Sequence, residues 1–162
     1  MRREIILSLA ALTATAAGTA QAATATSTFA VSAAVLTSCQ VTATPLAFGA
    51  YDPAAGSAID AANSLVVTCT TGTPYTVGLN AGAGAGATVA IRKMNNGPDL
   101  LNYSIYSDAA RTSIWGATVG TNTFAATAGV LPATIPVYGR VFAGQNVTAG
   151  AYTDLINVTV NY

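Results

Sequence analysis

Few residues in this 162-residue sequence are suited to chemistry. It contains no histidine, the side chain that titrates nearest to neutral pH, and its only glutamate is Glu4. Serines and threonines are plentiful, but none has a base partner that would activate it as a nucleophile. The remaining carboxylates are scattered aspartates, mostly beside turn residues, whereas glycoside hydrolysis needs a matched carboxylate pair. We therefore expect a protein that is not an enzyme and needs no cofactor.

Two cysteines, Cys39 and Cys69, are the only thiols. In an exported chain such a pair most often forms a structural disulfide, here closing a loop of about 30 residues. The alternatives are a metal-binding pair or a redox pair. The spacing is far too wide for Cys-x-x-Cys chemistry, and no histidine is present to complete a metal site. We predict a disulfide and no bound metal.

The N-terminus has the pattern of a secretory signal peptide spanning residues 1–22. Arg2 and Arg3 precede the apolar run Ile5–Ala11, and Ala20–Ala22 fits the small-x-small cleavage rule. A membrane anchor is the alternative, but the apolar run is too short to span a bilayer. We expect export through the inner membrane into the periplasm, with residues 23–162 as the mature chain and no membrane insertion.

The charge of the mature chain excludes some partners. Without the signal it would carry four basic and five acidic side chains. This balance gives no electrostatic reason to bind nucleic acid or an anionic membrane surface. So few charges would also leave a free monomer poorly soluble, which suggests that much of the surface is covered in the working state.

The elements that must position these residues are short strands separated by turns. No window outside the signal sustains a helical period, and Asn96-Gly97 is a hairpin signal. The glycine-rich segment 81–87 is expected to be a flexible surface loop. This pattern predicts a single-domain β-sandwich. Strand-like segments cover 29–36, 39–44, 64–70, 75–80, 88–94, 101–107, 114–115, 135–142 and 151–162.

Both ends of the mature chain have strand patterns with one apolar face. The N-terminal face carries Phe29, Val31, Ala33 and Val35, and the C-terminal face carries Ile156, Val158, Val160 and Tyr162. Strand-like segments at both termini suggest subunits that join by exchanging strands. From the residues alone, an ordinary first strand of a self-contained sandwich has the same period, so both interpretations stay open.

Several blocks stand in order across nearly the whole mature chain. They are Phe48–Pro53, Ile91–Met94 with Leu101–Asp108, Arg111 with Ile114–Gly116, Pro136–Gln145 with Gly150–Asp154, and Val158–Tyr162. With Cys39 and Cys69, these blocks resemble the spore coat U domain family, which includes the pilins of archaic chaperone–usher pili. The resemblance depends on the order and spacing of the blocks rather than on any one of them.

The resemblance implies an incomplete immunoglobulin-like β-sandwich over residues 23–162 that lacks its final strand. A periplasmic chaperone would first fill the groove beside the strand Ile156–Tyr162. At the outer-membrane usher, residues 23–36 of another copy would then replace the chaperone by β-strand addition, with Phe29–Val35 as the donor strand. The implied function is a structural subunit of a cell-surface pilus that serves adhesion and biofilm formation.

Two other functions compete with the pilus subunit. One is a spore-coat or surface-coat structural protein of the same fold. The other is a secreted carbohydrate-binding or adhesin module, for which aromatic side chains would have to form a stacking platform. Packing in the core is the expected role of these aromatics, because aromatics at strand period usually face inward. The candidates are Tyr103, Tyr106, Trp115 and Tyr138.

Overall fold

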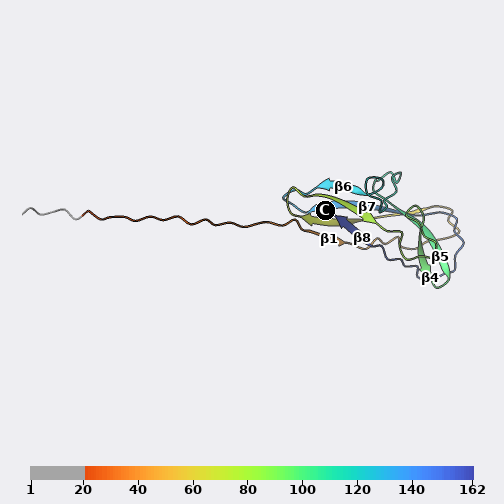
Figure 1. Cartoon of the computed structure of the whole chain (residues 1–162). Helices are drawn as coiled ribbons and strands as arrows, with labels where there is room; N and C mark the ends of the chain where they lie inside the picture. The colour runs from red at the N-terminus through yellow and green to blue at the C-terminus, as the bar shows by residue number, and fades with distance from the viewer. Residues whose placement is uncertain (1–20) are drawn as a thin grey trace, which may run out of the picture. The chain divides into compact units, whose positions relative to one another are not determined.

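The computed structural model describes residues 21–162, and residues 1–20 of the predicted signal peptide lie outside the described residues. The chain divides into two units between Ala34 and Val35. The second unit is built from β-strands joined by turns and loops (Figure 1). Residues 21–162 contain no helix, which confirms the predicted all-β fold. The strands are β1 (Cys39–Ala43), β2 (Ile59–Cys69), β3 (Pro74–Leu79), β4 (Arg92–Asn96), β5 (Asp99–Tyr106), β6 (Phe124–Thr127), β7 (Ala133–Val141) and β8 (Val158–Asn161).

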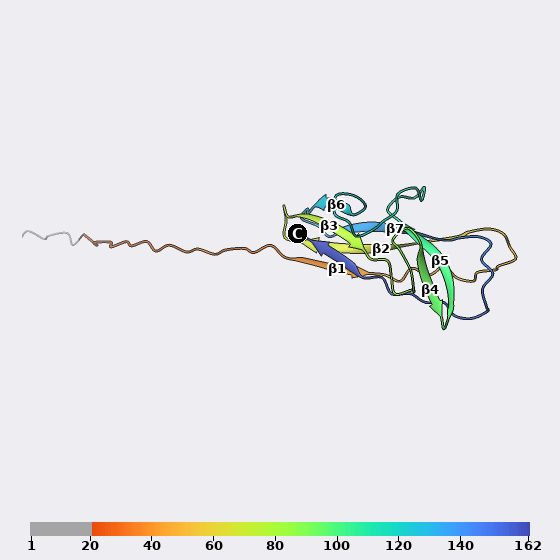
Figure 2. The same ribbon diagram turned by 45° about the vertical axis from the view of Figure 1, so that its right-hand side comes forward.

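The strands form two antiparallel sheets. The larger sheet has the strand order β1-β2-β7-β5-β4, and the smaller has the order β6-β3-β8. β1 and β8 are therefore edge strands, each paired on one side only within the described residues. The two edge strands are in contact, and Figure 2 shows them side by side.

The period of two along the strands builds the core. In β7, Ile135 and Val137 are buried, whereas Pro136 between them is exposed. Trp115 is fully buried between the strands and donates its indole N–H to the carbonyl of Val77 at 2.9 Å. The core thus combines apolar strand faces with aromatic side chains such as Trp115, whose polar atom is satisfied.

A disulfide fixes β1 to β2. Cys39 and Cys69 are direct partners in the β1–β2 ladder, with Cα atoms 4.0 Å apart, and their sulfur atoms are bonded. The predicted disulfide is therefore confirmed. It spans 30 positions of the chain, and the chain-entropy model gives such a bridge about 3–4 kcal/mol of stabilisation.

Some strand boundaries differ from the prediction. β2 begins at Ile59 rather than Ser64, because its ladder with β7 continues to that residue. β4 begins at Arg92 rather than Thr88, since the Thr88 hydroxyl accepts the N–H of Ile91 at 3.0 Å and closes a turn there. In both places tertiary pairing or local turn chemistry, not apolar periodicity, sets the boundary.

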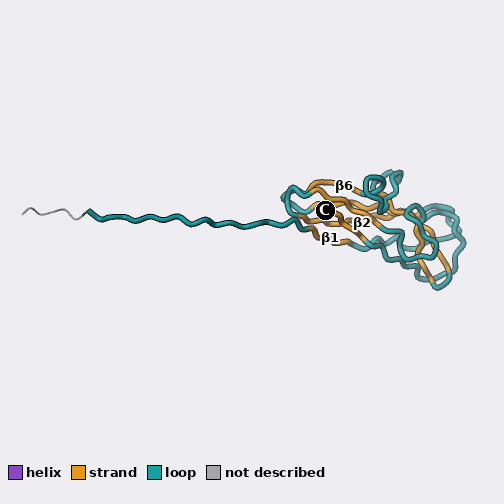
Figure 3. Tube along the Cα trace, in the orientation of Figure 1, coloured by secondary structure: helices purple, strands orange, loops and turns teal. Residues whose placement is uncertain are grey.

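Other segments also differ from the sequence prediction when a single chain is considered. Sequence reasoning missed β6, which is only four residues long and has two alanines at its centre. The predicted strand 114–115 makes only one bridge, between Ile114 and Tyr106. Residues 29–36 form no strand, and Figure 3 shows residues 21–38 without regular secondary structure. A strand requires a backbone partner, and this segment has none within residues 21–162.

The glycine-rich segment 81–87 is a loop with exposed residues, as expected, but part of it packs against other segments. Gly84 is buried, and a Cβ atom there would lie 2.3 Å from the carbonyl oxygen of Lys93. Gly82 has a φ of +85°, and its missing side chain leaves room for the carboxylate of Asp154. These glycines are required because other segments approach the backbone too closely for a side chain.

Candidate functional site

The candidate site lies where the two open sheet edges meet. An unpaired edge presents a row of backbone N–H and C=O groups that can bond another strand. In an antiparallel ladder, successive residues direct these groups alternately toward the partner strand and away from it. The hydrogen bonds at the ends of β1 and β8 therefore show, for each residue of these strands, whether its backbone N–H and C=O groups point toward the partner strand or toward the open edge.

Along β8, the residues whose side chains face the core are the ones whose backbone N–H and C=O groups are not bonded to β3. The N–H of Asn80 donates to the carbonyl of Asn157 at 3.2 Å, so Asn157 faces β3. By alternation Ile156, Val158 and Val160 direct their backbone groups to the open edge. The side chains of these same three residues pack against the core.

The edge of β1 has the same arrangement. The N–H of Thr70 donates to the carbonyl of Ser38 at 2.9 Å, which fixes the alternation along the β1–β2 ladder. Cys39, Val41 and Ala43 therefore direct their backbone groups away from β2. Both edges can accept hydrogen bonds from, and donate them to, one additional strand.

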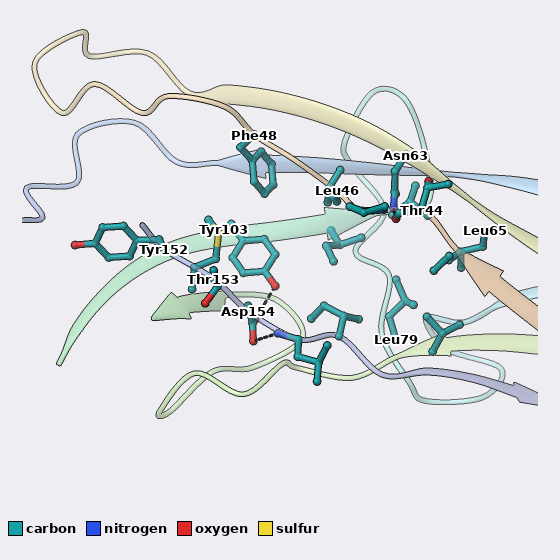
Figure 4. A pocket seen from close by; sticks show the side chains of 18 residues that line it. Thr44, Leu46, Phe48, Asn63, Leu65, Leu79, Tyr103, Tyr152, Thr153 and Asp154 are labelled. Atoms are coloured by element: carbon teal, nitrogen blue, oxygen red, sulfur yellow. Dashed lines mark hydrogen bonds between the residues drawn. The ribbon is translucent and has the colours of Figure 1, made fainter. Parts of the chain in front are cut away.

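A cavity of about 430 Å³ lies between these edges (Figure 4). We call it the edge groove. One wall is the chain after β1, residues 43–48, and the other is the chain before and into β8, residues 152–156 and Val158. The floor consists of buried apolar side chains from both sheets, so the groove reaches the hydrophobic core. The floor residues are Leu65, Leu79, Tyr103, Ile105 and Val137.

The edge groove continues into a second cavity of about 590 Å³. The two cavities share the lining residues Leu46, Phe48, Met94 and Tyr152. Sequence reasoning did not assign these four residues to the site. The available signal was the presence of Leu46, Phe48 and Tyr152 inside turn-rich stretches, where large apolar residues are not needed for the turns themselves.

One polar group in the groove lacks a partner. The side chain of Asn63 donates to the carbonyl of Thr44, but its Oδ1 atom is buried without a hydrogen bond. Asn63 and Thr44 both line the edge groove. A buried acceptor of this kind costs free energy unless it is paired, so an incoming N–H would stabilise the site.

A carboxylate fixes the wall of the groove that precedes β8. The hydroxyl of Tyr103 donates to Asp154 at 2.6 Å, and the N–H groups of Ala83 and Leu155 donate to the same carboxylate at 2.7 and 2.8 Å. Burial, followed by the bond to Asp154, raises the pKa of the Tyr103 hydroxyl above its ordinary value. The tyrosine therefore stays a donor at neutral pH and ties this wall to β5.

Arg92 is a second buried polar centre. It is fully buried, and its guanidinium donates to the carbonyls of Asn80 at 2.9 Å, Val89 at 2.8 Å, Leu79 at 3.2 Å and Trp115 at 2.7 Å. Burial lowers the pKa of the guanidinium to about 10, so it is still charged at neutral pH. Its five N–H donors suit a cluster of carbonyls, and this is a structural role.

Some aspartates accept hydrogen bonds in turns, as the sequence suggested, whereas others bond side chains from distant segments. Asp52 accepts the N–H of Ala54 at 2.9 Å, as expected for a turn residue. Asp60 instead pairs with Arg140 at 2.7 Å and with Arg111 at 3.3 Å. No three His, Cys, Asp or Glu side chains in residues 21–162 lie close enough together to hold a metal ion.

The aromatic side chains considered for a carbohydrate-stacking platform do not share one exposed surface. Tyr103, Tyr106 and Trp115 are buried, which confirms their expected role in packing. Tyr138 is partly buried beneath the guanidinium of Arg111, whose Cζ atom lies 5.8 Å from the ring centre. These four rings cannot stack together on one sugar.

The structure brings together only part of the predicted strand-exchange residues. Ile156 and Val158 line the edge groove, and Val160 packs against the core next to them. Tyr162 is 61% exposed. The predicted donor residues are all exposed, with Phe29 at 88%. Their role as donors stays a prediction.

Comparison with known proteins identifies relatives of the described fold. The Spore Coat Protein U domain family model matches residues 25–159. "Protein U" of Myxococcus xanthus is 38% identical over 128 residues, which cover 72% of this chain and 71% of that protein. The family-model match therefore includes β1–β7, the start of β8, the edge groove and most of the predicted donor segment.

A solved structure has a similar fold. It is a chain in the crystal structure of the CsuC–CsuE chaperone–tip adhesion subunit pre-assembly complex from archaic chaperone–usher Csu pili of Acinetobacter baumannii. The TM-score is 0.60 at 24% sequence identity. The match covers 79% of this chain but only 40% of the other. At this identity, the likeness shows the fold alone.

Within residues 21–162, no helix has the length and apolar character needed to cross a bilayer.

Proposed function

The chain belongs to the Spore Coat Protein U domain family, and we propose that it is a structural subunit of a surface pilus assembled by donor-strand exchange. One observation carries the proposal. The same chain has an apolar groove between two unpaired strand edges and an exposed, alternating apolar segment without a backbone partner. The segment of one copy can complete the groove of another.

Insertion would follow the chemistry of β-strand addition. The backbone of residues 29–35 would bond the free groups of Val158 and Val160 on β8 and of Ile156 just before it. Phe29, Val31, Ala33 and Val35 would point toward the groove floor, since residues two apart lie on one face of a strand. Burying the phenylalanine and the two valines contributes on the order of 1.5–3 kcal/mol each.

Assembly would need help before the polymer exists, because an unfilled groove and an open edge are prone to aggregation. We propose that the signal peptide of residues 1–22 directs export to the periplasm, where a chaperone fills the groove. An outer-membrane usher would then exchange the chaperone for the donor segment. The fold match to a chain of a chaperone–subunit complex supports this sequence of partners. Adhesion and biofilm formation would be the roles of the finished pilus at the cell surface.

A coat protein is the second candidate function. The family model is that of a Spore Coat Protein U domain, and this observation favours the alternative. Strand exchange between copies could build a coat as well as a fibre, since only the geometry of successive subunits differs. Electron microscopy of the assembled protein separates a filament from a sheet.

Deleting residues 23–36 tests strand exchange. The chain without residues 23–36 keeps its groove but has no donor segment. It should therefore not form polymers alone, and it should stop the growth of polymers of the full chain. Purified polymer length and yield, measured by electron microscopy and by gel electrophoresis without heating, give the readout. The full chain exported in the same host is the control. Normal polymers from the deleted chain would show that the units assemble through their faces instead.

A further inference from the structure

Leu36 and Ser38, which follow the predicted donor strand, are bonded to one end of the second unit. The hydroxyl of Thr70 accepts the N–H of Ser38 at 3.1 Å and donates to the carbonyl of Leu36 at 3.2 Å. The N–H of Thr70 also donates to the carbonyl of Ser38 at 2.9 Å. The chain is therefore held at this end, beside the disulfide, as far as Leu36.

This attachment leaves almost no free linker. The predicted donor strand, Phe29–Val35, ends at Val35, and the carbonyl of the next residue, Leu36, already accepts a hydrogen bond from Thr70. One extended residue spans at most about 3.3–3.6 Å. A neighbouring copy that holds Val35 in its groove must therefore lie directly against the end of the unit from which the extension leaves.

Exposed apolar side chains gather at the same end. Leu36 is 82% exposed, Val130 is 85% exposed and Leu131 is 78% exposed. The loop that carries Val130 and Leu131 is joined to the same turn as Leu36, because the hydroxyl of Thr71 donates to the carbonyl of Gly129 at 3.4 Å. Single exposed apolar residues are ordinary, but a group of them beside a forced junction indicates an interface.

We propose that Leu36, Val130 and Leu131, the exit cap, form a second contact surface that is covered by the neighbouring copy holding this chain's extension. The inference rests on the proposed strand exchange, because that exchange is what brings the neighbour to this end. The cap has no charged side chain of its own, so its partner surface is apolar. The contact sets the angle between successive subunits and slows their separation.

Hydroxyl-radical footprinting of polymers of the full chain tests the cap. Val119 is exposed in the single subunit and lies outside the cap, so it is the internal control. We expect the oxidation of Val130 and Leu131 in the polymer to fall at least about fivefold relative to Val119. Residues 29–35 should be protected in the same sample. If residues 29–35 are protected and the cap is not, the cap inference is wrong while strand exchange stands. If residues 29–35 are unprotected, strand exchange fails and the inference fails with it.

A pair of variants gives an independent readout. V130D/L131D should still insert its extension, but its polymers should dissociate about tenfold faster on heating, because two apolar contacts are lost and charges are buried. V119D places one aspartate on an exposed valine away from the cap, and its polymers should dissociate like the unaltered polymer. Equal dissociation rates for V130D/L131D and V119D would overturn the inference.

Discussion

Arg92 shows how a single residue can hold together segments that are far apart in the sequence. Its guanidinium bonds carbonyls that belong to the end of β3, to the segment before β4 and to Trp115. No carboxylate contacts it in residues 21–162. Replacing it would leave several buried acceptors without donors, and each such acceptor costs about 1–3 kcal/mol.

We predict that R92M lowers the free energy of unfolding by at least about 3 kcal/mol, because several carbonyls lose their hydrogen bonds at once. Urea denaturation of the variant measures this loss. K93M is the matched control. Lys93 donates only to the carbonyl of Ala85 at 3.2 Å and is partly exposed, so its loss should cost less than about 0.5 kcal/mol. An R92M midpoint equal to that of K93M would contradict the structural role.

The surface carboxylate of Asp60 makes a pH-dependent contribution to the stability of the folded protein. The hydrogen bond from Arg140, with further attraction from Arg111, holds the pKa of the Asp60 carboxyl below its ordinary value. A folded-state pKa below the unfolded one stabilises the protein above the unfolded pKa, and this contribution disappears as the pH falls through the folded pKa. The stabilisation is present at neutral pH and is lost below about pH 4.

We predict that D60N lowers the midpoint of thermal unfolding at pH 7 but has little effect at pH 2–3. The loss at pH 7 should be below about 1 kcal/mol, because the pair is partly exposed and screened by solvent. Calorimetry at both pH values measures the difference. The prediction fails if D60N and the unaltered protein differ by the same amount at low pH as at neutral pH.

Sequence patterns predicted individual residues well where the chemistry is local. The two cysteines, the turn aspartate Asp52 and the packed aromatics behave as their residue types indicated. Arg92 and the Tyr103–Asp154 bond could not be predicted, because their partners come from segments that only the tertiary fold brings together. The packing of the glycine-rich loop was missed for the same reason.

At the level of elements, the open edges of β1 and β8 explain why the terminal patterns matter. On both edges, the residues with unpaired backbone groups are mainly those whose side chains face the core or the edge groove. A strand inserted between them would satisfy backbone groups and cover apolar surface at the same time. The face that the strand presents should therefore decide whether assembly occurs.

We predict that V31D abolishes polymer formation, whereas S32D does not. Val31 is on the apolar face of the donor segment, so the charge would be buried without a partner, at a cost of several kcal/mol. Ser32 is on the opposite face, where a charge stays in solvent. Electron microscopy and gel electrophoresis of both variants give the readout. Equal loss of polymer in V31D and S32D would mean that the segment does not insert with this face inward.

Element boundaries were predictable only in part. Alternating apolar strands such as β3, β5 and β7 match their sequence patterns closely. β6 and the first half of β2 were missed, since they are strands through pairing with β3 and β7 rather than through their own composition. The donor segment has a strand pattern without a strand, which is the result expected when the partner belongs to another molecule.

For the whole molecule, the order of the sequence blocks was enough to indicate the family. It did not indicate the edge groove. The edge groove depends on the distance between two sheet edges and on loops of irregular structure, which no periodic pattern encodes. The lining residues shared by the two cavities, Leu46, Phe48, Met94 and Tyr152, come from the loop after β1, from β4 and from the loop before β8. Their joint role became visible only when the strands were placed in space.

The most direct measurement of strand exchange is hydrogen exchange at the β8 edge in a self-completed subunit. Residues 23–36 are deleted, and Phe29–Val35 is attached after Tyr162 through a flexible linker long enough to allow either strand direction. The same fusion carrying V31D is the control. The amides of Val158 and Val160 should exchange at least about tenfold more slowly in the fusion than in its V31D form, while the amide of Thr159, which faces β3, is protected in both. Equal exchange of Val158 and Val160 in the two proteins would contradict insertion of the segment beside β8.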